Sequence, residues 1–231
     1  MTPDAEPEAP DHLGHRDRLR QRLLGSGAGA LADYEILEFL LFSALPRQDT
    51  KPIAKALIQR FGSLGGVLAA DVTELRSVKG IKDSGAATFK AVLEAARRLS
   101  RERIVERPLL SSWQAVIEYC RLAVGHESLE QFLLLFLDRK NRLIADERQQ
   151  RGTVDHTPVY PREVVKRALD LKASAIILVH NHPSGDPTPS RLDIETTKEI
   201  AAAASKLGIA VHDHIVIGAA GHFSFKSEGL L

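Results

Sequence analysis

Apolar residues recur at helical spacing through the first hundred residues and predict a series of short helices. Glycines at 25–29 and at Gly62 interrupt the pattern, and no alternating pattern typical of a strand appears in this part of the chain. The expected helices cover residues 16–24, 34–42, 49–60, 71–77 and 86–99. The pattern therefore predicts a small all-helical domain over residues 12–100.

Beyond residue 108 the apolar residues gather in short continuous runs that alternate with amphipathic stretches. The runs at 131–137 and 143–145 flank a polar turn and predict a β-hairpin. Further strands are expected at 173–179, 209–218 and 221–225, and helices at 112–123, 161–171 and 190–207. Strands interleaved with helices predict an α/β sandwich over residues 109–231.

Two charged segments border these domains. Residues 101–108 are expected to form a linker, and residues 1–11, acidic and rich in proline, to form a disordered tail. The tail has no apolar core, so no secretory signal is expected.

Composition narrows the class of protein. The chain has 231 residues, of which 44% are hydrophobic and 26% charged, as in soluble globular proteins. A single cysteine, Cys120, excludes an internal disulfide and any zinc site built from several thiolates. Apolar runs fall far short of the ~20 residues of a membrane helix. We expect a cytoplasmic protein with no membrane contact.

Candidate chemistry is concentrated in residues 180–193. His180 and His182 lie two apart at the end of an expected strand, where their side chains share one face and can converge on one metal ion. A stiff turn with three prolines and a glycine follows, and then Ser190 and Asp193 at the start of a helix. Two imidazoles and one carboxylate leave a coordination position open for water, as in catalytic zinc sites.

The same residues also have structural interpretations. Ser190 and Asp193 match a helix-capping pattern, with Ser190 as the N-cap, and a histidine at a strand end is often only a hydrogen-bonded polar residue. Two histidines, a rigid turn and an acid that the turn brings back to the end of the strand together favour a metal site. Ser190 would then both cap the helix and act in catalysis.

This spacing resembles the JAMM (MPN-plus) metalloprotease signature of His-x-His, seven residues, Ser, two residues and Asp. The surroundings resemble the RadC family of bacterial proteins. The supporting segments are 15–19, 33–38, 152–153, 159–165, 180–193 and 213–218.

The resemblance implies a zinc-dependent peptidase or isopeptidase with one Zn²⁺ per chain and a peptide or isopeptide substrate. It also implies an upstream glutamate that, with zinc, activates water, and by position this falls on Glu130, before the first expected strand. Glu127, Glu147 and Glu163 are rivals for this role. The Ser190 hydroxyl would help zinc to stabilise the oxyanion.

A second hypothesis concerns the helical half. Residues 12–104 carry 16 Lys and Arg against 10 Asp and Glu, and Gly80-Ile81-Lys82 between two helices resembles a helix-hairpin-helix module. Such modules contact DNA backbone, with Lys79 and Lys82 supplying charge here. The alternative function is thus a DNA-associated protein with a structural or dormant metal site. His212-Asp213-His214 is interpreted as strand residues, possible neighbours of the ligands rather than ligands.

Overall fold

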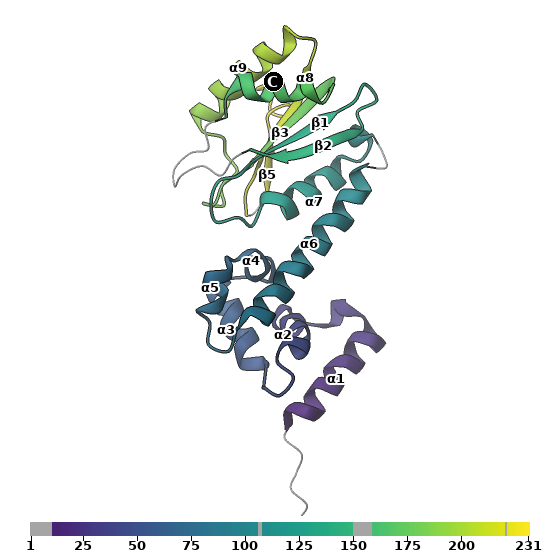
Figure 1. Cartoon of the computed structure of the whole chain (residues 1–231), viewed down its shortest axis with the longest axis vertical. Coiled ribbons are helices and arrows are strands. Elements are labelled where there is room, and N and C mark those ends of the chain that lie inside the picture. Colours follow the sequence, from purple (N-terminus) through teal and green to yellow (C-terminus); the bar gives the residue numbers. More distant parts are fainter. Residues whose placement is uncertain (1–10, 106–107, 150–158, 220) are drawn as a thin grey trace, which may run out of the picture. The chain divides into compact units, whose positions relative to one another are not determined.

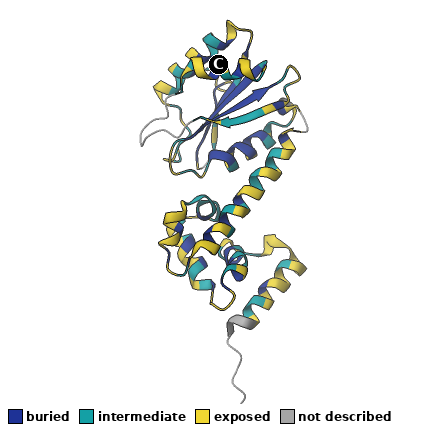
Figure 2. Cartoon of the chain, viewed as in Figure 1, coloured by how far each residue is buried: buried dark blue, intermediate teal, exposed yellow. Residues whose placement is uncertain are grey.

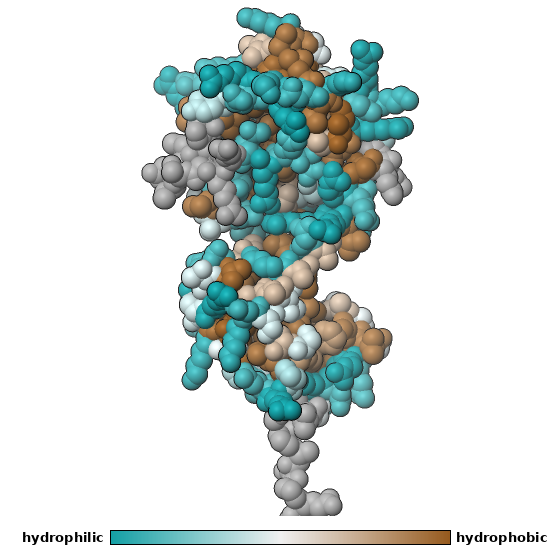
Figure 3. Space-filling model, viewed as in Figure 1, coloured by the Kyte–Doolittle hydropathy of each residue, from teal (hydrophilic) through white to brown (hydrophobic). Residues whose placement is uncertain are grey.

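The computed structural model describes residues 11–105, 108–149, 159–219 and 221–231, and it divides into two compact units at Glu94/Ala95 (Figure 1). The expected tail therefore lies outside the described residues except for Asp11, which begins the first helix. Among the described residues, no helix is long and apolar enough to cross a membrane. On the face shown in Figure 3, hydrophilic side chains are mixed with smaller hydrophobic patches over both units.

The N-terminal unit is helical over its described residues, as the apolar periodicity predicts. Its helices are α1 (Asp11–Ser26), α2 (Asp33–Ala44), α3 (Lys51–Phe61), α4 (Leu64–Ala69), α5 (Val72–Arg76) and the first half of α6 (Asp83–Val105). The short helix α4 was not predicted, because two glycines interrupt its apolar pattern. Buried residues of α2, α3 and α6, such as Leu41, Leu57 and Phe89, form one core.

Charged side chains connect α1 to α2 and to the residues that follow α2. Arg16 donates hydrogen bonds of 2.6–2.7 Å to the carbonyls of residues 45, 46 and 48. Glu38 is fully buried and lies 3.2 Å from His15 Nε2, while Arg22 pairs with Glu35 at 2.6 Å. The basic residues of α1 thus bind carbonyls and carboxylates of this unit as well as facing solvent.

The expected linker at 101–108 differs from the structure, because α6 continues as a helix to Val105. Its C-terminal half belongs to the second unit: Ile104 is buried in the core of that unit and Arg101 pairs with Asp146 at 2.6 Å. The charges that suggested a linker are the polar face of a helix whose other face is buried. Residues 106–107 lie outside the described residues.

The C-terminal unit is a mixed five-stranded sheet with helices on both faces, which confirms the predicted α/β sandwich. The strand order is β2 (Leu143–Arg148), β1 (Phe132–Leu137), β3 (Ala175–Asn181), β4 (Ala210–Ile217) and β5 (His222–Ser224). The predicted β1–β2 hairpin is confirmed as an antiparallel pair, and β3 pairs in parallel with β4.

Alternate residues of the central strands enter two cores on opposite faces. Leu133, Leu135 and Val179 pack with α7 (Trp113–Val124) on one face. The other face packs against α8 (Pro161–Asp170) and α9 (Arg191–Ser205). Every residue of β1 and β3 is buried (Figure 2), as expected for strands covered on both faces. This rigid sheet positions the C-terminal end of β3, where the candidate residues lie.

Candidate metal centre

The two histidines lie where β3 leaves the sheet. His180 is the penultimate residue of β3 and is fully buried, whereas His182 follows the strand and is partly exposed. Their Nε2 atoms are 2.9 Å apart. The spacing of two residues along a strand thus brings both imidazoles to one point, as the sequence predicts.

The turn after His182 is held against the end of β4. The His182 amide donates to the Ile217 carbonyl at 2.9 Å, and the Ala219 amide donates to the Gly185 carbonyl at 3.0 Å. Gly185 has φ 90°, a conformation that favours glycine. His182 Nδ1 lies 2.8 Å from the Asp186 carbonyl, which can only accept a hydrogen bond. When its ring is neutral, His182 therefore carries its proton on Nδ1 and presents the Nε2 lone pair to the centre.

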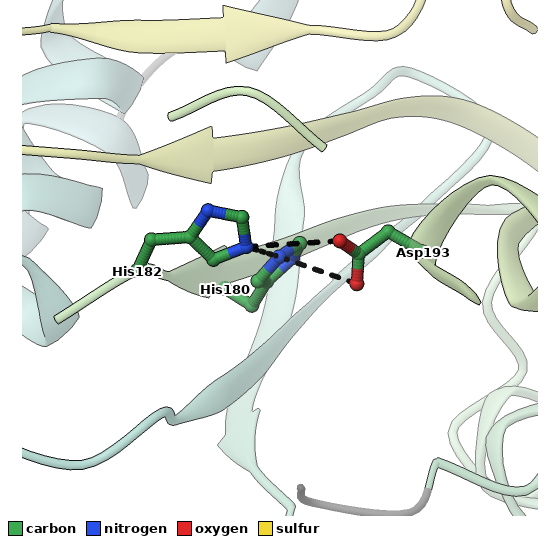
Figure 4. A group of neighbouring side chains, drawn as sticks. All are labelled: His180, His182 and Asp193. Atoms are coloured by element: carbon green, nitrogen blue, oxygen red, sulfur yellow. Dashed lines mark hydrogen bonds and ion pairs between the residues drawn. The ribbon is translucent and has the colours of Figure 1, made fainter. Parts of the chain in front are cut away.

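Asp193 reaches the same point from the first turn of α9. Its Oδ1 lies 3.5 Å from His180 Nε2 and its Oδ2 3.6 Å from His182 Nε2 (Figure 4). Ser190 is the N-cap: its amide donates to Asp193 Oδ2 at 2.6 Å, and the Asp193 amide donates to Ser190 Oγ at 3.2 Å. The capping interpretation therefore holds, and the same capping pair holds the carboxylate facing the histidines.

The geometry of these three side chains fits a divalent cation. One ligand atom from each of His180, His182 and Asp193 lies within 4.8 Å of the other two, and this is the one such group of three or more in the described part of the chain. The two Nε2 atoms are 2.9 Å apart, and each lies 3.5–3.6 Å from a different oxygen of the Asp193 carboxylate, compared with ~3.3–3.4 Å between ligand atoms around a tetrahedral ion with bonds of about 2.0–2.1 Å. Nitrogen and carboxylate donors in this number suit zinc with one position open.

The electrostatics of the cluster favour neutral His180 and ionised Asp193. Burial lowers the pKa of His180 to about 4, against the opposing charge of Asp193. Burial would raise the pKa of Asp193, but hydrogen bonds from His182 and Ser190 and the proximity of His180 lower it well below its usual value. The hydrogen bond to Asp193 raises the pKa of His182. His180 and Asp193 are thus in the protonation states that metal binding requires.

Glu130 lies next to this cluster. It comes two residues before Phe132, which pairs with His180 in the antiparallel β1–β3 ladder, so continuing that register places residue 130 opposite His182. The charge of Glu130 contributes to the raised pKa of His182, which requires the two side chains to be close. Glu130 is therefore a candidate general base, and that role remains a prediction.

The three rival glutamates are engaged elsewhere. Glu127 pairs with two arginines at 3.0 and 3.1 Å, Glu147 binds Arg167 through both carboxylate oxygens, and Glu163 pairs with Arg162 at 3.2 Å. Each rival thus has an arginine partner, and the choice of Glu130 over these three stays a prediction.

Asn181, between the two histidines, was missed by the sequence interpretation. Its side chain accepts a hydrogen bond from the Gln131 amide at 2.7 Å and donates to the carbonyls of Glu127 and Leu129 at 3.2 Å. These bonds hold the peptide groups on both sides of Glu130. Strand alternation indicates that Asn181 faces away from the histidines, but only the tertiary structure shows what it binds.

Thr197 was also missed as part of the site, whereas His214 agrees with the interpretation of residues 212–214 as strand residues and possible neighbours of the ligands. His214 Nε2 lies 2.8 Å from His180 Nδ1, and His214 Nδ1 lies 2.6 Å from Thr197 Oγ1. The second His-x-His pair does not act as a unit, because His212 Nε2 instead lies 2.7 Å from Asn141 Oδ1 in the β1–β2 turn. The second His-x-His pattern in the sequence indicated that a histidine of this strand could lie near the site, but it does not show which of the two does.

A mixed α/β sandwich with a His-His-Asp cluster at the end of its central parallel strands defines a JAB-type (JAMM-like) domain. Residues 110–230 match the RadC-like JAB domain family, and residues 11–87 match the UPF0758 N-terminal family. A UPF0758 protein from Rhodobacter capsulatus is 60% identical over 213 residues, which cover 92% of this chain and 100% of that protein. The chain belongs to the UPF0758 family with a RadC-like JAB domain, which confirms the resemblance.

Proposed function

We propose that the C-terminal unit is a zinc-dependent hydrolase that cleaves the amide bond of a peptide or an isopeptide. The observation that carries this proposal is the convergence of His180, His182 and Asp193 on one point, with one ligand atom from each within 4.8 Å of the other two. A site that served only structure would be expected to use four protein ligands, whereas this cluster offers three among the residues that the structure describes.

In this proposal each side chain has one task. His180, His182 and Asp193 hold one zinc ion per chain. Bound zinc would supply Lewis-acid polarisation and lower the pKa of a water molecule towards ~7. Glu130 takes the proton from the attacking water and passes it to the leaving amine, so that hydroxide ends on the carbonyl carbon and the amine leaves neutral. Ser190, beside Asp193, donates its O–H to the oxygen on which negative charge develops.

Metal analysis of the full chain tests the ligands. We expect about one zinc per wild-type chain and loss of zinc in His182→Ala, because a ligand is removed. His212→Ala is the matched control, since His212 lies outside the cluster and should leave the zinc content unchanged. Equal zinc content in His182→Ala and wild type would refute the ligand assignment.

Glu130→Gln separates catalysis from metal binding. An unbiased screen of peptide and isopeptide substrates identifies a cleaved bond, and Glu130→Gln should then retain zinc and lose hydrolysis by about 10²–10⁴-fold. A wild-type protein that holds zinc and cleaves no amide would favour a structural or dormant metal site.

We also propose that the N-terminal unit contacts DNA backbone. The supporting observation is the turn between α5 and α6, where exposed Lys79 and Lys82 flank buried Ile81 and Gly80 has φ 98°. The affinity for DNA should fall steeply as the salt concentration rises. Replacement of both lysines by alanine should reduce the affinity and make it less dependent on salt. Lys55→Ala, on α3 beside the Tyr34 ring, is the control. Binding that does not respond to salt would refute this proposal.

A further inference from the structure

A chain of three short hydrogen bonds reaches the Nδ1 atom of His180, whereas the Asp193 carboxylate and the His182 ring lie near its Nε2 atom. Thr197 Oγ1 donates to the main-chain carbonyl of Asp193 at 2.5 Å. His214 Nδ1 lies 2.6 Å from Thr197 Oγ1, and His180 Nδ1 lies 2.8 Å from His214 Nε2. Thr197 from α9, His214 from β4 and His180 from β3 are all buried. We call Thr197, His214 and His180 the relay.

The Asp193 carbonyl determines the direction of every proton in the relay. A carbonyl only accepts, so the single hydroxyl proton of Thr197 is used there and Thr197 Oγ1 must accept from His214 Nδ1–H. His214 is buried against the Phe132 and Phe225 rings, where a charged imidazolium would be unfavourable, so its ring is neutral and its Nε2 accepts. His180 Nδ1 must therefore donate, and the His180 Nε2 lone pair points to the centre.

Aromatic rings hold both imidazoles in this orientation. Phe132 stacks on His180 with ring centroids 6.0 Å apart and an angle of 4° between planes. Phe225 stacks on His214 at 4.6 Å and 25°. A flipped ring in this apolar enclosure would leave an N–H or a lone pair without its partner, which is unfavourable in a buried place.

We propose that Thr197 and His214 are positioning residues of the metal centre, which hold His180 with its Nδ1 proton on the relay and its Nε2 lone pair towards the cation. The relay begins at the main chain of Asp193, whose side chain is another proposed ligand. The helix ligand and the strand ligand are thereby joined before any cation binds. This inference rests on the proposed metal site and deepens it.

Zinc affinity of the full chain, measured by competition with a chromophoric chelator, tests the relay. Thr197→Val keeps the shape of the side chain and removes its hydroxyl, so affinity should fall by about 10–100-fold. Thr197→Ser restores the hydroxyl and should bind close to wild type. Thr196→Val, one residue earlier on α9, is the matched control.

His214→Gln should weaken zinc binding in the same way, and His212→Gln on the same strand is its control. Cobalt substitution adds a spectroscopic readout, because a mispositioned His180 changes the visible absorption of bound Co²⁺. Affinities and spectra of Thr197→Val and His214→Gln equal to those of their controls would overturn the relay and leave the metal site standing. A wild-type chain that binds zinc no better than His182→Ala would overturn both.

Nitrogen-15 NMR of the metal-free full chain tests the relay without any cation. We expect the Nδ1–H tautomer on both His180 and His214 in wild type, and a loss of that fixed tautomer on His214 in Thr197→Val. An Nε2–H tautomer on either histidine in wild type would contradict the proton directions derived from the Asp193 carbonyl.

Discussion

Gly218, at the end of β4, is predicted to be essential for the position of His182, although it carries no side chain. A Cβ atom at Gly218 would lie 2.8 Å from Pro187 Cδ and 2.9 Å from Pro187 N, and closer still to the Gly185 carbonyl oxygen. These atoms belong to the turn whose Asp186 carbonyl holds the His182 ring. Gly218→Ala therefore pushes the turn away from the sheet.

The size of the displacement follows from these contacts. Ordinary van der Waals contact begins at 3.4 Å, so Pro187 Cδ must move by about 0.6 Å and the Gly185 carbonyl by more. Metal–ligand distances tolerate only about ±0.2 Å. Moving His182 by several tenths of an ångström should weaken zinc binding by about tenfold or more. Strain of this kind typically destabilises a protein by about 1–3 kcal/mol.

The assay compares zinc affinity and melting temperature of Gly218→Ala with those of wild type and Gly221→Ala. A Cβ at Gly221, three residues away, would have nothing within 4 Å, so this variant controls for the loss of a glycine in the same turn. If Gly218→Ala bound zinc as tightly as Gly221→Ala and melted at the same temperature, close contact with Gly218 would not hold the turn at residues 183–187 in place. The prediction would then be wrong.

Three further predictions concern other parts of the chain. Asn181→Leu should retain zinc but lower the rate of hydrolysis at least about tenfold, because the hydrogen bonds that hold the segment of the proposed base are lost. Amide hydrogen exchange in the segment before β1 should become faster, and an unchanged exchange rate would contradict this role of Asn181. The hydrogen bond from Arg22 lowers the pKa of Glu35 below its usual value of 4.5. The stability that this pair contributes is therefore present above pH 4.5 and is lost as the pH falls through the lowered pKa. Urea unfolding should show Glu35→Gln less stable than wild type at neutral pH and less sensitive to acid. The free energy of unfolding of a fragment 110–231 should be lower than that of a fragment 95–231 by at least about 1.5–3 kcal/mol, since the shorter fragment lacks buried Ile104. Equal denaturant midpoints would argue against a role for α6 in the core of the C-terminal unit.

Local patterns in the sequence were sufficient for most elements and for the proposed metal ligands. Strand runs such as 173–179 and helices such as 34–42 lie within two residues of their observed bounds, because periodicity reports burial directly, whereas the expected helices 16–24 and 86–99 cover only parts of α1 and α6. His180 and His182 are neighbours on one strand, and Asp193 and Ser190 begin one helix, so short-range geometry already brings these side chains towards each other.

Other features depend on contacts between segments far apart in the chain. The charges at 101–105 look like those of a linker until Arg101 meets Asp146 and Ile104 enters the second core. The β1–β3 register, which pairs Phe132 with His180, brings Glu130 towards His182.

The sequence by itself thus determined most of the secondary structure, the two-part organisation and the proposed ligands, since each is encoded over a few residues. The tertiary structure alone decided which residues support those ligands. Thr197, His214 and His180 come from α9, β4 and β3, and they meet only because parallel pairing sets β4 beside β3 under the start of α9. A hydrogen bond between residues 34 apart in sequence has no local pattern, because its geometry exists only once the sheet has formed.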